Sequence, residues 1–125
     1  MINEVFGWVW ITVGFAAGAL LGPAMSRADW LGGYTSERRR YLRLAHISLV
    51  MLGVLNILFA HGVRDHTSAS GIVTAASVGL IVGAVTMPMV CGLSAWRPGF
   101  RALFPVPVLS LIAGGALTAA GMVLS

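Results

Sequence analysis

The strongest constraint on the fold is a set of four apolar runs, separated by short segments that hold nearly all the charges. A helix needs about 20 apolar residues to cross the hydrocarbon core of a bilayer. Each run is long enough, and together they predict helices at residues 5–25, 37–63, 71–95 and 103–124. The sequence therefore predicts an all-α integral membrane protein, a four-helix transmembrane bundle that forms a single domain over residues 1–125.

The composition argues against a soluble protein. Hydrophobic residues make up 58% of the chain and charged residues 10%, whereas soluble domains have roughly 45–50% and roughly 25%. The net charge of +4 comes from eight arginines and four acidic residues. Because the arginines lie between apolar runs, we expect them to set membrane topology, and we expect a lipid bilayer as the partner and no nucleic acid.

The arginines are distributed unevenly among the connections. The first connection holds five, the second holds only Arg64, and the third holds two. Arginine-rich loops are retained in the cytoplasm. We therefore predict that the first and third connections are inside and that the N and C termini are both outside, in a multi-pass protein of the bacterial plasma (inner) membrane.

Small residues recur at a spacing of four, which places them on one face of a helix as a groove for a neighbouring backbone. They are Gly14, Gly18 and Gly22 in the first helix and Gly79 and Gly83 in the third. Such grooves serve either packing inside the bundle or contact between copies of the chain. Asn56, near the middle of the second helix, is predicted to form a hydrogen bond with another helix, because a buried amide in lipid needs a partner.

The histidines are the candidate ligands. His46 and His61 are fifteen residues apart on the second helix, which separates them by about 22 Å in height, so they cannot hold one haem together. His61, His66 and Met122 are expected at the same outer surface, where nitrogen and sulfur ligands would suit copper or haem b. The alternative interpretations are a solvated turn for His61 and His66 and an interfacial histidine for His46.

A second group of soft side chains lies around a proline in the third helix. Met87 and Cys91 are four residues apart and share a face, whereas Met89 points away from both. Such side chains suit Cu(I), but methionine also fills gaps where a helix bends. Pro88 leaves the carbonyl of Ala84 without its usual donor and predicts a kink.

The sequence contains no recognisable catalytic set, so we expect no enzymatic activity. We predict a small accessory or scaffold subunit that packs through its glycine grooves into a homo-oligomer or a larger membrane complex. The first alternative is a haem- or copper-binding redox or assembly protein, and the second is an uncoupled channel or carrier. Coupled transport is disfavoured, because no carboxylate lies deep within the four runs.

Overall fold

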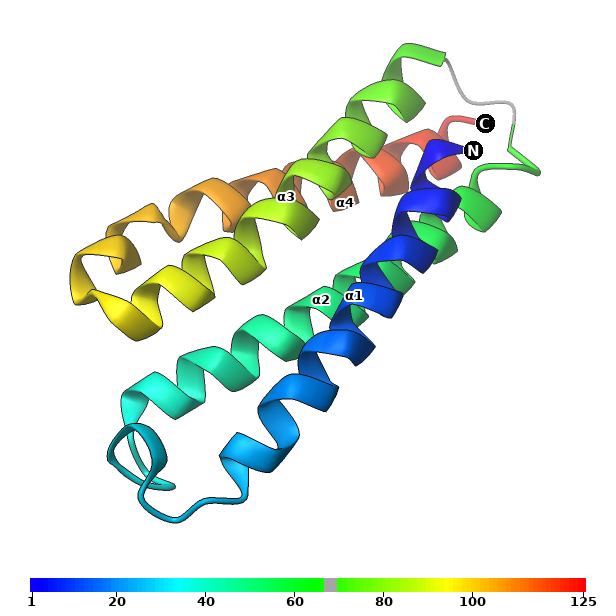
Figure 1. The fold of residues 1–125 in the computed structure, drawn as a ribbon. Helices are drawn as coiled ribbons and strands as arrows, with labels where there is room; N and C mark the ends of the chain where they lie inside the picture. The colour runs from blue at the N-terminus through cyan, green and yellow to red at the C-terminus, as the bar shows by residue number, and fades with distance from the viewer. Residues whose placement is uncertain (67–69) are drawn as a thin grey trace.

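The computed structural model describes residues 1–66 and 70–125, and it consists of long helices joined by short connections (Figure 1). The elements are α1 (Ile2–Met25), the 3₁₀ helix η1 (Trp30–Gly32), α2 (Glu37–Gly62), α3 (Ser70–Trp96), the 3₁₀ helix η2 (Pro98–Leu103) and α4 (Pro105–Val123). The described residues contain no strand. Four helical segments are long and apolar enough to cross a membrane: α1, α2, α3 and Pro98–Val123, which comprises η2 and α4. The predictions of an all-α chain and of four such helices are confirmed, and the fold is consistent with a multi-pass membrane protein.

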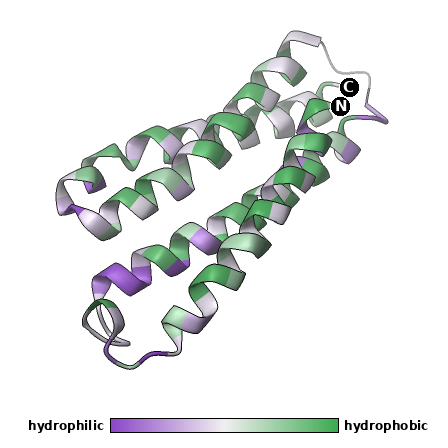
Figure 2. Ribbon diagram, in the orientation of Figure 1, coloured by the Kyte–Doolittle hydropathy of each residue, from purple (hydrophilic) through white to green (hydrophobic). Residues whose placement is uncertain are grey.

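The helices pack in chain order, α1 on α2, α2 on α3 and α3 on α4. The molecule is thus two helical hairpins joined through α2 and α3. Both termini lie at one end, here called the terminal end, together with the start of α3 (Figure 1). The connections after α1 and after α3 lie at the opposite end, here called the arginine-rich end because it holds every arginine except Arg64. Figure 2 shows hydrophilic residues concentrated at the start of α2 and apolar residues along the helices.

Helix α3 is the most enclosed element. In the most apolar stretch of α3, 44% of the residues are buried. In the corresponding stretch of each of the other three candidate spans, 17% are buried. Phe59 of α2 and Ala76 and Leu80 of α3 form a buried cluster against which side chains of α4 pack. The outward faces of α1, α2 and α4 are therefore largely apolar and uncovered within this chain.

Local signals explain where the helices begin. The Ser36 hydroxyl accepts a hydrogen bond from the backbone N–H of Arg39 at 3.3 Å, which caps α2. Pro105 begins α4, where its missing N–H has no intrahelical partner to lose. Helix α1 begins at Ile2 and not at Val5 as predicted from the sequence. This earlier start places the first polar side chains of the chain inside α1.

Glycines allow the two helices of the first hairpin to approach closely. A Cβ atom on Gly7 would lie 2.5 Å from the carbonyl oxygen of Gly53, and a Cβ on Gly14 would lie 2.5 Å from Cγ2 of Val50. Atoms this close would force the helices apart. Gly22, in contrast, has no such neighbour within 4 Å, so the predicted groove on α1 contacts α2 along only part of its length.

The second hairpin has the same kind of contact. A Cβ atom on Gly79 would lie 3.0 Å from the carbonyl oxygen of Ser110, and Gly83 lies against the side chain of Leu111. On the opposite helix, a Cβ on Gly114 would lie 2.9 Å from the backbone nitrogen of Leu80. Gly79 and Gly83 therefore face α4 of the same chain.

A tryptophan of α1 supplies the hydrogen bond that Pro88 removes from α3. The indole N–H of Trp10 donates to the carbonyl oxygen of Ala84 at 2.8 Å. That carbonyl would normally accept from the backbone N–H of residue 88, which proline lacks. The contact joins the first hairpin to the second near the middle of α3.

Candidate functional site

At the terminal end, a buried polar network joins three helices. The Asn3 side chain of α1 donates to the amide oxygen of Asn56 at 2.8 Å, and the Ser77 hydroxyl of α3 donates to the amide oxygen of Asn3. The Asn56 amide also donates to the carbonyl oxygen of Leu52 at 2.9 Å. Asn3 and Asn56 are fully buried. These groups bind one another, so the network holds the helices together and leaves little capacity for a ligand.

His61 lies at the terminal end and pairs with a carboxylate. Its Nε2 atom is 3.6 Å from Oε1 of Glu4, and the other oxygen of Glu4 accepts a hydrogen bond from Arg64. His66 hydrogen-bonds through Nδ1 to the carbonyl oxygen of Gly62 at 2.9 Å. Sequence reasoning missed Glu4, because it was placed before the predicted helix.

Met122 lies near these histidines along the bundle, where its methyl group packs against Gly62. The structure thus brings His61, His66 and Met122 to the same end. In the described part of the chain, no group of three or more His, Cys, Asp or Glu residues is arranged to hold a metal ion. Metal or haem ligation by His61, His66 and Met122 stays a prediction.

His46 occupies a different environment, half-buried on α2 toward the arginine-rich end. Its ring fits against Gly18, where a Cβ atom would lie 2.8 Å from Cε1 of the imidazole. Its Nδ1 atom is buried and has no hydrogen-bond partner among the described residues. Gly22, Met25 and Arg43 help to line the small hollow beside it, of about 160 Å³.

This hollow is smaller than the roughly 300–1,000 Å³ of typical ligand pockets. A haem on His46 would therefore not be enclosed within one chain, and a second axial histidine would have to come from another copy. The structure explains why Gly18 is glycine, because the imidazole fills the space of its missing side chain.

Arg39 belongs to the arginine cluster that was interpreted from the sequence as a topology signal, yet its side chain is 1% exposed. Its guanidinium donates to the carbonyl oxygens of Met25 and, at 2.9 Å, of Arg27. It also lies over the ring of Tyr34, 4.5 Å from the centroid, and farther from that of Trp30. Arg39 thereby satisfies carbonyls at the end of α1 and anchors the first connection.

An apolar cleft of about 320 Å³ opens between α2 and the second hairpin. Its lining includes Leu44, Ser48 and Met51 from α2, Met87 and Cys91 from α3, and Phe104. The sequence indicated that Met87 and Cys91 share a face, but it gave no sign that Met51 would join them. Within residues 1–66 and 70–125, no histidine or carboxylate lines this cleft.

Side chains from the two hairpins contact one another at the arginine-rich end. Arg101 donates to Oε2 of Glu37 at 2.8 Å, and its guanidinium lies 4.8 Å from the centre of the Tyr41 ring. Tyr41 and Phe104 have ring centres 6.2 Å apart. The start of α2 is thus tied to η2 and to the start of α4, and the cleft lies between this tie and the buried cluster nearer the terminal end.

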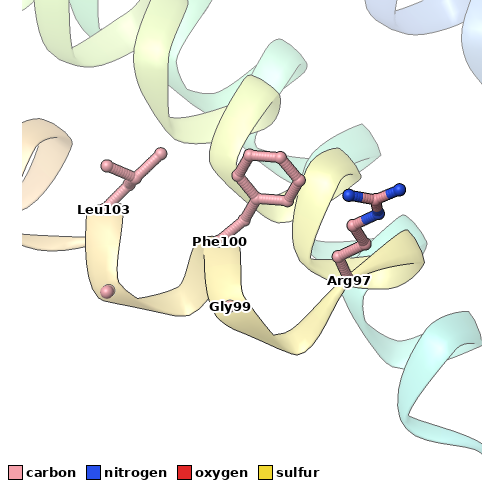
Figure 3. A pocket seen from close by; sticks show the side chains of 5 residues that line it. Arg97, Gly99, Phe100 and Leu103 are labelled. Carbon is pink, nitrogen blue, oxygen red and sulfur yellow. The ribbon is translucent and has the colours of Figure 1, made fainter.

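A further hollow, of about 390 Å³, lies on the surface beside η2. In Figure 3 the side chains of Arg97, Phe100 and Leu103 project to the same side of this segment. Gly99 and Ala102 complete the lining, so Arg97 is the only charged residue that the described part of the chain contributes to it. One guanidinium among apolar groups provides little basis for selecting a particular small molecule.

Comparison of the chain with models of known protein families, with curated proteins and with solved structures finds no match.

Proposed function

We propose that the protein is a small, non-enzymatic accessory or scaffold subunit of the bacterial plasma membrane, which associates laterally with copies of itself or with a larger complex. The observation that carries this proposal is an uncovered small-residue face on α4. A Cβ atom on Gly115 would meet nothing within 4 Å. Ala119, four residues on and so on the same side of the helix, is exposed as well, and so is the adjacent Ala116.

Glycine inside a helix costs roughly 0.5–1 kcal/mol relative to alanine. At Gly79 and Gly114 this cost is offset by close approach of the partner helix, because a Cβ there would lie about 3 Å from backbone atoms. At Gly115 none of the helices described here provides the compensation. Small residues spaced four apart, as Gly115 and Ala119 are, favour close contact between membrane helices. We assign this face of α4 to the partner.

The test compares substitutions at two glycines. Gly115→Ile is expected to shift the protein from its assembled form to a monomer without lowering its melting temperature, because the new side chain enters open space. Gly79→Ile is expected to destabilise the fold itself. Mass measurements in lipid nanodiscs and cross-linking in native membranes would distinguish a homo-oligomer, with products at multiples of the chain mass, from a complex with another protein.

Leu20→Ile is the control for a change on a lipid-facing surface, since Leu20 is 80% exposed on α1. It should leave assembly unchanged. A wild-type chain that is monomeric in nanodiscs and cross-links to nothing in its native membrane would exclude the scaffold function. Equal assembly of the wild type and Gly115→Ile would exclude α4 as the contact.

A further inference from the structure

Three sulfur-bearing side chains from two helices line the cleft between the hairpins. Met87 and Cys91 lie one helical turn apart on α3, with Cβ atoms about 6 Å apart, and Met51 of α2 lines the same cleft. Met51 is 58% exposed, whereas Cys91 is only 3% exposed. The lining thus includes both an exposed sulfur-bearing residue, Met51, and a buried one, Cys91.

The chemistry of this lining is selective. Thioether and thiolate groups are soft ligands and select Cu(I), whereas Mg²⁺ and Ca²⁺ require oxygen ligands. Apart from the sulfur groups, the described lining offers one side-chain donor, the hydroxyl of Ser48, which is a poor ligand for Cu(I). The set of donors is therefore one that a monovalent soft ion would bind and a hard ion would not.

Charge balance favours the same ion. When the Cys91 thiol binds Cu(I), a Cu–S bond forms and the thiol proton leaves to solvent, so the site remains neutral and no redox change occurs. A divalent ion on the same thiolate would leave a positive charge in an apolar cleft, which is strongly unfavourable. The low polarity of the cleft thus favours Cu(I) over Zn²⁺.

We propose that the cleft binds one Cu(I) ion through the Cys91 thiolate and the Met87 and Met51 thioethers. Met51, at the rim, is the first sulfur that an entering ion meets, and Cys91 holds the ion at the wall. This site is separate from His46, which packs against Gly18 of α1, and from His61 at the terminal end, and it extends beyond the proposed scaffold function.

The same segment of α3 supplies a matched control. Met89 is 57% exposed and lines a different surface with Val106 and Leu103. Met89→Leu and Met87→Leu each remove one thioether, at positions two residues apart. Leucine and methionine have similar volumes, so both substitutions are compatible with folding.

The experiment is a competition between the purified full-length protein and bathocuproine disulfonate for Cu(I), without oxygen and with ascorbate present. One Cu(I) is expected per chain. Cys91→Ala should weaken binding by more than about 100-fold, because loss of even an outer-shell partner costs about 10–100-fold. Met87→Leu should weaken Cu(I) binding, and the double variant with Met51→Leu added should weaken it further. Met89→Leu should match the wild type.

X-ray absorption of the copper complex should show sulfur ligands alone. Melting followed by circular dichroism identifies any variant that is unfolded, and the methionine double variant tests the site even if Cys91→Ala does not fold. Absence of Cu(I) uptake, equal loss in Met89→Leu, or nitrogen ligands in the absorption spectrum would each overturn the site. Gly115→Ile should bind copper normally, so failure of the scaffold proposal and failure of the copper site are distinguishable.

Discussion

At the scale of single residues, two polar groups within the apolar helices are matched by donors from other helices. The carbonyl that Pro88 leaves free on α3 accepts from Trp10 of α1. Asn56 similarly finds Asn3. Each of these pairs joins residues more than 50 positions apart in sequence, and an unpaired polar group away from water costs several kcal/mol. Such pairs thus fix which helices lie together.

Replacing Trp10 with phenylalanine should lower the free energy of unfolding by about 1 kcal/mol, because the Ala84 carbonyl loses its donor while the ring is largely retained. Unfolding in mixed micelles with increasing denaturing detergent measures this loss. Trp8→Phe is the control, since Trp8 is 60% exposed. A similar loss in both variants would show that the hydrogen bond contributes nothing specific.

A double-mutant cycle tests whether the hydrogen bond from Trp10 to the Ala84 carbonyl is the cause of this loss of stability. Pro88→Ala restores a backbone N–H that can donate to the carbonyl of Ala84. In that background Trp10→Phe should have a smaller effect than in the wild type. Additive effects of the two substitutions would mean that Trp10 acts through packing alone, including its stacking on Phe6 at 4.9 Å between ring centres.

At the scale of elements, the closeness of each helix pair is set by particular glycines. Gly7→Ala should destabilise the first hairpin strongly, because its Cβ would meet the backbone oxygen of Gly53 at 2.5 Å. Gly18→Ala should have a smaller effect, because the His46 ring can move aside. Gly22→Ala should be neutral or stabilising by up to about 1 kcal/mol, since its surroundings are open. Thermal melting of the three variants should give this order, and any other order would contradict the packing.

The apolar runs were enough to predict four helices, because length and hydropathy act locally along the chain. The partners across helices were not predictable in the same way. Asn3 was excluded from the first helix by its place before the apolar run, and Met51 has no sequence link to Met87 and Cys91. Their proximity depends on how α2 turns against α1 and α3, which glycine contacts and buried hydrogen bonds determine together.

At the scale of the whole molecule, the two hairpins are tied at both ends. Asn3, Asn56 and Ser77 join them at the terminal end, and the Arg101–Glu37 pair joins them at the arginine-rich end. The cleft with Cys91 lies between these two ties. Its position allows a bound ion to contact both hairpins without separating them.

The two ends of the molecule differ in charge, and this difference leads to the last prediction. All arginines except Arg64 lie at one end, so this end should face the cytoplasm and both termini should lie outside. Single cysteines at Thr35 and Ser125, both exposed positions at opposite ends, report the orientation in a Cys91→Ala background. In intact cells an impermeant maleimide should label the cysteine at position 125 and should label position 35 only after permeabilisation. Labelling of position 35 in intact cells would reverse the topology.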